Sequence, residues 1–143
     1  MAVWYAFGLL AGMAQAVQAA VNVQLRAAVQ SPLWAALISF VVGTLGLALL
    51  VLATRASIPL QWPSRPWVWC GGLLGVLYVC AAILLLPRLG AGTMLALFVA
   101  GQMSMALALD HYGLLGVPVH TTSPGRLLGA VLVVAGVFLL RRA

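Results

Sequence analysis

The sequence predicts an all-α integral membrane protein with five transmembrane helices, and two observations lead to this class. Of the 143 residues, 65% are hydrophobic and only 6% are charged, whereas soluble domains carry about 25% charged residues. The apolar residues also fall into five runs close to the roughly 20 residues that a helix needs to cross a bilayer. We therefore expect residues 1–143 to form a single transmembrane domain.

The first run, from residue 2 to about 24, is distinguished by a ladder of amide side chains. Gln15, Gln18 and Asn22 are spaced i, i+3 and i+7, so on a helix they fall within an arc of roughly 60°. Trp4 extends the same face toward the start of the run. An unpaired amide in hydrocarbon costs about 2–7 kcal/mol, so these side chains must face protein, water or a ligand. The ladder therefore predicts either hydrogen bonds between helices or the lining of a polar cavity.

The remaining runs predict helices at about 33–54, 67–87, 91–110 and 125–140. A segment with three prolines separates the second run from the third and predicts a loop at 55–66. Tyr78 in the third helix and Gln102 in the fourth are further candidates for contact with a substrate.

Glycines recur on several of these runs, and small residues let transmembrane helices approach closely. The glycines expected at contacts between helices or between copies of the chain are Gly8, Gly12, Gly71, Gly75, Gly125, Gly129 and Gly136.

Asp110 is the single acidic residue of the chain, at the end of the fourth run. We expect it to pair with Arg126 or to hold the loop that follows. Alternatively, Asp110 and His111 titrate or act as a gate, since both groups can carry a proton. Their spacing matches neither a catalytic triad nor a metal site, so we expect no enzymatic activity, no cofactor and no metal ion.

The seven arginines do not gather on one amphipathic face, which argues against nucleic-acid binding. They lie singly or in a pair at the ends of apolar runs, where they suit anionic lipid headgroups. Five crossings place three arginines on the side of the N-terminus and four on the other side, so the positive-inside rule assigns no orientation. A chain that inserts both ways needs such a balance; alternatively, a partner or one dominant helix sets the orientation.

Several stretches resemble one family of membrane proteins. They are an AxxNxxLR run that ends at Arg26, GGLLGVLYVCAAILLLPRLGAG at 71–92, TMLALFVAGQMSMALALDHYGLLGVP at 93–118 and GRLLGAVLVVAGVFLLRR at 125–142. The chain is similar over nearly its full length to the YdcZ family, a branch of the drug/metabolite transporter superfamily. The resemblance implies a bacterial inner-membrane protein that supplies one of the two inverted five-helix repeats found in larger members, so that an antiparallel homodimer would rebuild the pair.

The resemblance and the residues together imply a transporter that works by alternating access. Another branch of the superfamily carries a glutamate in its first helix and couples protons to cation export; this sequence has no acid there, so we do not expect that mechanism. Amide and aromatic side chains suit a small neutral, zwitterionic or amphiphilic solute. This class includes lipid-like substrates. The alternative hypotheses are a membrane assembly module that transports nothing and one half of a heterodimeric transporter.

Overall fold

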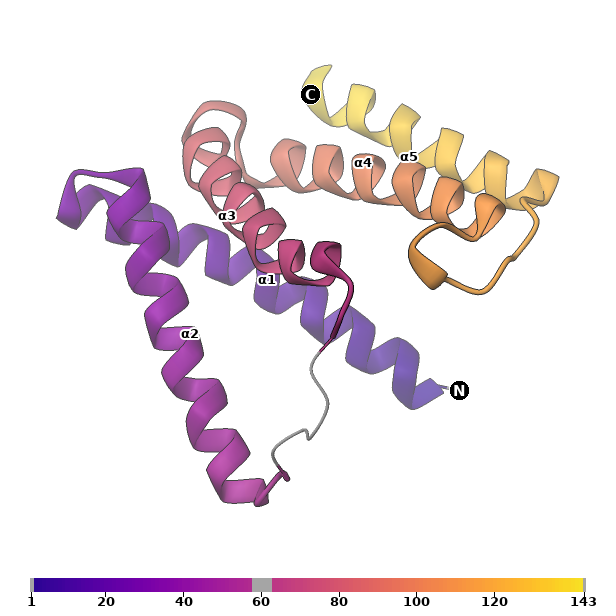
Figure 1. Cartoon of the computed structure of the whole chain (residues 1–143). Coiled ribbons are helices and arrows are strands. Elements are labelled where there is room, and N and C mark those ends of the chain that lie inside the picture. Colours follow the sequence, from indigo (N-terminus) through magenta and orange to yellow (C-terminus); the bar gives the residue numbers. More distant parts are fainter. Residues whose placement is uncertain (1, 58–62, 143) are drawn as a thin grey trace. The chain divides into compact units, whose positions relative to one another are not determined.

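The computed structural model describes residues 2–57 and 63–142, and these residues form helices joined by short connections (Figure 1). The helices are α1 (Ala2–Val29), α2 (Pro32–Thr54), α3 (Cys70–Leu89), α4 (Ala91–Tyr112) and α5 (Pro124–Arg142), with the 3₁₀ turns η1 (Pro66–Trp69) and η2 (Leu114–Gly116). No strand occurs in the described ranges. The prediction of an all-α protein with five helices is confirmed.

Within residues 2–57 and 63–142, four segments are long and apolar enough to cross a membrane, and α5 supplies a shorter apolar helix. Most large apolar side chains point outward: Leu52 on α2 is 73% exposed and Leu139 on α5 is 70% exposed. Such exposure is unfavourable in water and suits the lipid phase. The chain divides into two compact units, Met1–Arg88 and Leu89–Ala143, and each is described by itself.

The turn between α1 and α2 is shorter than the sequence predicted. Helix α1 continues to Val29 rather than ending near residue 24, so the connection is only Gln30 and Ser31. Gln30 adopts the left-handed conformation, with φ of 58°, and Ser31 caps α2 by accepting a hydrogen bond from the Trp34 amide at 3.4 Å. Pro32 follows at the first helical position, where its missing N–H is not needed. Of the predicted loop at 55–66, residues 58–62 lie outside the described part of the chain.

In the first unit, α1 and α2 diverge from this turn, and α3 packs near the place where they meet (Figure 1). Ala35 and Ala36 of α2 are buried against Val79 and Ile83 of α3. Leu25 and Val29 of α1 and Phe40 of α2 pack against the same cluster. Away from it, residues 2–14 of α1 and 41–54 of α2 are all exposed. The core of this unit therefore lies at one end of the α1–α2 pair.

One hydrogen bond in this core follows from a proline. Pro87 lies inside α3 and has no N–H, so it cannot donate to the carbonyl of Ile83 four residues earlier. Nη1 of Arg26 on α1 donates to that carbonyl oxygen at 3.3 Å. A helix that spans lipid must satisfy its backbone groups within the protein. Arg26 thus supplies the donor that Pro87 withholds and ties the end of α1 to the end of α3.

In the second unit, α4 and α5 form an antiparallel hairpin whose connection is held at several points (Figure 1). Gly113 ends α4 in the left-handed conformation, and its N–H donates to the Leu109 carbonyl. A Cβ at this position would lie 2.7 Å from Cγ2 of Val119, so both the backbone angle and the contact require glycine. The His120 amide donates to the backbone oxygen of Asp110 at 2.9 Å.

We predict that Arg26→Met lowers the free energy of unfolding by about 1–3 kcal/mol, the usual cost of leaving a buried acceptor unpaired. Adding Pro87→Ala should recover part of this loss, because alanine restores an N–H that can donate to Ile83. Denaturant titration of the purified protein in detergent micelles would measure the four variants of this double-mutant cycle.

Arg88→Met is the matched control, because Arg88 is exposed at the end of α3 and its loss should change stability by less than about 0.5 kcal/mol. If Arg26→Met has the same effect with and without Pro87→Ala, the two residues do not act on one carbonyl.

Candidate functional site

A cavity of about 230 Å³ lies within the first unit. Its lining comes from α1, α2 and α3 and consists of Gln18, Ser39, Phe40, Gly43, Thr44, Leu47 and Val79. We call it the α1–α3 cavity. Its volume is below the roughly 300–1,000 Å³ of pockets for drug-sized ligands.

The helical repeat explains how α2 supplies most of this lining. Ser39, Gly43 and Leu47 are spaced four residues apart and therefore share a face. Phe40 and Thr44 lie beside them at the same spacing. Toward α3 the ring of Phe40 packs on Gly75, where an added Cβ would be 3.6 Å from Cζ of the ring.

The polar groups of the α1–α3 cavity are uncharged. They are the carboxamide of Gln18 on α1 and the hydroxyls of Ser39 and Thr44 on α2. A carboxamide and a hydroxyl can each donate and accept hydrogen bonds, so this set can bind either kind of polar group on a solute. Sequence reasoning did not assign Ser39 and Thr44 to a site, although their positions on one side of α2 could have indicated it.

The amide face of α1 is buried at Asn22 and exposed at Gln18. Asn22 is 4% exposed and Ala19 is 6% exposed, and these are the buried residues that α1 contributes. Gln18 is one turn before Asn22 and lines the cavity, while Gln15 is half-buried. The structure thus buries Asn22, whereas Gln18 stays exposed at the cavity. Substrate binding by the ladder stays a prediction.

The other substrate candidates lie elsewhere. Tyr78 packs against the core cluster, next in sequence to Val79 of the cavity lining. Trp4 is 74% exposed and is absent from that lining. Gln102 belongs to α4 and lines a different cavity.

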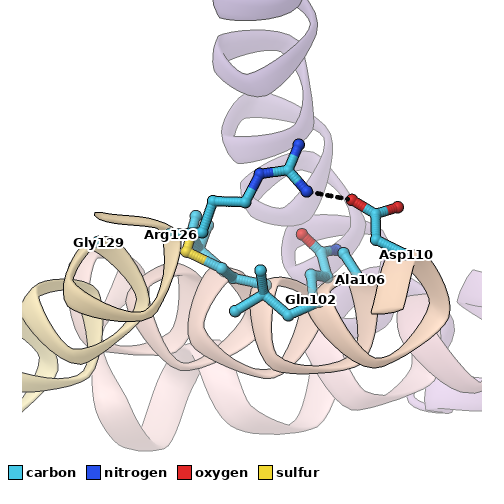
Figure 2. Close-up of a pocket in the computed structure, with 8 residues that line it drawn as sticks. Gln102, Ala106, Asp110, Arg126 and Gly129 are labelled. Carbon is cyan, nitrogen blue, oxygen red and sulfur yellow. Dashed lines mark hydrogen bonds and ion pairs between the residues drawn. The ribbon is translucent and has the colours of Figure 1, made fainter. Parts of the chain in front are cut away.

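That second cavity, of about 480 Å³, lies between α4 and α5. Its lining residues are Val99, Gln102, Met103, Ala106, Leu107, Asp110, Arg126 and Gly129, and we call it the α4–α5 cavity. Figure 2 shows Arg126 reaching from α5 toward Asp110 on α4, with Gln102 and Ala106 on the same side of α4 as Asp110.

The ion pair expected from the sequence is present in this cavity. Nη1 of Arg126 lies 3.1 Å from Oδ2 of Asp110, and the two side chains are 43% and 31% exposed, respectively. Asp110 also holds the following loop through its backbone oxygen, which the His120 amide contacts. His111 is exposed, and its Nδ1 accepts from the Thr122 amide at 3.5 Å. A gating role for Asp110, His111 and Arg126 stays a prediction.

Of the seven glycines expected at helix contacts, Gly75 has such a contact within its unit, with Phe40. A Cβ at Gly125 would lie 3.9 Å from Oγ of the nearby Ser123. At the other five, an added Cβ would meet no atom within 4 Å: Gly8, Gly12, Gly71, Gly129 and Gly136. Their packing against a second copy of the chain stays a prediction. In the described ranges, no group of three His, Cys, Asp or Glu residues could hold a metal ion.

Long helices with apolar outer surfaces and few charged side chains define a multi-pass helical membrane protein. Comparison with known proteins makes the class specific: residues 3–139 match the family described as "Putative inner membrane exporter, YdcZ". The chain therefore belongs to the YdcZ family. Membership makes it a multi-pass inner-membrane protein, and the description of the family is one of exporters and not of enzymes.

A curated relative supports this assignment. The chain is 38% identical over 78 residues to "Inner membrane protein YdcZ" of Escherichia coli (strain K12), a match that covers 54% of this chain and 52% of that protein. The chain thus spans about half the length of the curated relative it matches. No solved structure matches the chain.

The Asp110–Arg126 pair opposes both helix dipoles, since the carboxylate lies in the last turn of α4 and the guanidinium in the first turn of α5. We predict that Asp110→Arg combined with Arg126→Asp is at least as stable as the wild type, because the swap keeps the pair and places each charge at its favourable helix end. Denaturant titration in micelles would measure this.

Asp110→Asn and Arg126→Gln alone should each cost less than about 1 kcal/mol, as for other exposed pairs. A loss above about 3 kcal/mol in the swapped variant would show that the native arrangement is required for folding.

Proposed function

We propose that two copies of this chain, inserted in opposite orientations, form an antiparallel homodimer that moves a small neutral, zwitterionic or amphiphilic solute across the inner membrane by alternating access. The observation that carries this proposal is the α1–α3 cavity, which offers Gln18, Ser39 and Thr44 without a charged side chain in its lining.

The cavity chemistry supports this class of solute. A bare ion held among these residues would lose its hydration without meeting an opposite charge, which costs several kcal/mol. A solute with hydroxyl, amide or balanced charged groups can instead exchange its water contacts for the carboxamide and the two hydroxyls. The volume of about 230 Å³ agrees with a small molecule.

Three observations support an antiparallel pair. The five helices of the chain match the helix number of one repeat in the transporter superfamily that the sequence resembles. The first half of α1 and the second half of α2 are exposed, so a second copy could pack there. The arginines divide three to four between the two sides, which allows both orientations. Many transporters combine inverted repeats around a site near the midplane.

The glycines with open surroundings fit the same arrangement. Gly8 and Gly12 repeat on α1 at a spacing of four residues, and a Cβ at either would meet no atom of this chain within 4 Å. Such a stripe lets a helix of another copy approach closely. An interface of small residues also has few interlocking side chains, so the two copies can shift between inward-open and outward-open packings.

We predict that Gln18→Leu weakens solute binding at least fivefold while the dimer persists. A panel of amino acids, betaines, polyols and sugars would be screened by thermal shift on the purified protein. Solutes that stabilise the wild type should lose affinity at least fivefold in Gln18→Leu, because an unpaired polar group costs about 1–3 kcal/mol.

Gln24→Leu is the matched control, since Gln24 is an exposed amide on another face of α1. If Gln18→Leu instead dissociates the dimer, its carboxamide holds helices together and does not bind the solute.

We predict that the chain inserts in both orientations in similar amounts. Fusions of a periplasmic and a cytoplasmic reporter to the C-terminus should therefore both be active, within about a factor of three of each other. Added arginines in one short loop should shift the ratio, because K/R bias sets orientation. A single orientation would exclude the antiparallel homodimer and favour one half of a heterodimer.

A further inference from the structure

The α4–α5 cavity changes in polarity along its length. Its lining on α4 runs from Val99 to Asp110, roughly 16 Å along the helix axis at 1.5 Å per residue. One end carries the Asp110–Arg126 pair. Apart from Gln102, the other lining side chains on α4 are apolar, namely Val99, Met103, Ala106 and Leu107. A cavity with a charged end and an apolar body matches a molecule built in the same way.

The position of the charged end fits a lipid-derived molecule. Asp110 lies in the last turn of α4 and Arg126 in the first turn of α5, so both lie where the apolar spans end. Charged groups at this depth lie close to the lipid headgroups, whereas the opposite end of the cavity lies deeper in the hydrocarbon. A bound amphiphile would therefore keep the orientation that it has in the bilayer.

The charges of the cavity select the headgroup. One guanidinium and one carboxylate lie 3.1 Å apart and remain 43% and 31% exposed, so a ligand can reach both. A zwitterion can pair its anionic group with Arg126, which has several N–H donors, and its ammonium with Asp110. A purely anionic or cationic headgroup would satisfy one member and leave the other without its partner.

The placement of the pair also points to a ligand. Both charges oppose the dipole of their own helix, so stabilisation of the hairpin alone would favour the reverse arrangement. The present order puts the guanidinium in the first turn of α5 and the carboxylate in the last turn of α4. The start of α5 is thereby made distinctly positive and the end of α4 distinctly negative. Recognition of a dipolar headgroup requires such a separation of charge.

We infer that the α4–α5 cavity binds a single-chain amphiphile with a zwitterionic headgroup, such as a lysophospholipid. The acyl chain lies along Met103, Ala106 and Leu107 toward Val99, and the headgroup lies at Asp110 and Arg126. This site is separate from the α1–α3 cavity and its solute.

The test uses the full chain, purified in maltoside micelles, and radiolabelled lysophosphatidylethanolamine as the probe. A Cβ at Gly129 would meet no atom within 4 Å, so Gly129→Leu should place its side chain in the cavity without a clash. We expect saturable binding to the wild type and an affinity at least tenfold weaker in Gly129→Leu. Gly101→Leu is the matched control: Gly101 also has open surroundings and lies outside the lining, so its affinity should stay within twofold.

Headgroup recognition is tested on the same protein. Asp110→Asn and Arg126→Gln should each weaken binding at least fivefold. A monoacylglycerol and a fatty acid of the same chain length should compete at least tenfold more weakly than unlabelled lysophosphatidylethanolamine. Equal competition by the monoacylglycerol would show that the charges select nothing, and equal competition by the fatty acid would show an anion site; either result overturns the inference.

Folding of each variant is checked by size-exclusion chromatography and thermal unfolding. If Gly129→Leu does not fold, Ala106→Leu fills the same cavity from α4 and takes its place. Equal affinity of the cavity-filling and control variants, or no saturable binding to the wild type, overturns the inference. If the wild type does not bind lysophosphatidylethanolamine but still binds a solute in a way that depends on Gln18, the lipid site is rejected and the proposed transport function stands.

Discussion

The arrangement of the first unit depends on one backbone carbonyl, that of Ile83. Pro87 withholds the donor that this oxygen would have in a regular helix, and Arg26 provides it from α1. A helix in lipid satisfies its backbone groups within the protein, so the proline creates a requirement that Arg26 meets. A charged donor also makes a stronger bond than a neutral one, which suits a contact between two helix ends.

This contact determines which face of α1 turns inward. Gln18, Asn22 and Arg26 follow one another at intervals of four residues and so share a side of the helix. Once Arg26 is directed at α3, the two amides face the same way, which agrees with the burial of Asn22 and with Gln18 in the cavity lining. The hydrogen bond of Arg26 near the membrane surface thus also sets the direction of Gln18, the candidate binding group nearer the midplane.

The two units carry cavities of contrasting chemistry. The α1–α3 cavity has uncharged polar groups, whereas the α4–α5 cavity places one cation and one anion at the end of an apolar lining. Both avoid a net charge, which would be costly to bury in a membrane. A protein with so few ionisable residues can still distinguish solutes, because balanced dipoles and amides recognise shape and hydrogen bonding without a large desolvation cost.

The sequence by itself determined the class of protein, the five helices and the amide ladder of α1, and it offered Arg126 as one candidate partner of Asp110. Each follows from composition, from a helical period or from the scarcity of acidic partners. Only the tertiary structure decided that Ser39 and Thr44 complete the surroundings of Gln18, that Gln102 lies in another cavity, and that Arg26 serves α3. The periodicity of a segment fixes which of its residues share a face, but contacts with distant segments depend on how helices pack, and that is decided by side-chain volumes and unpaired backbone groups across the chain.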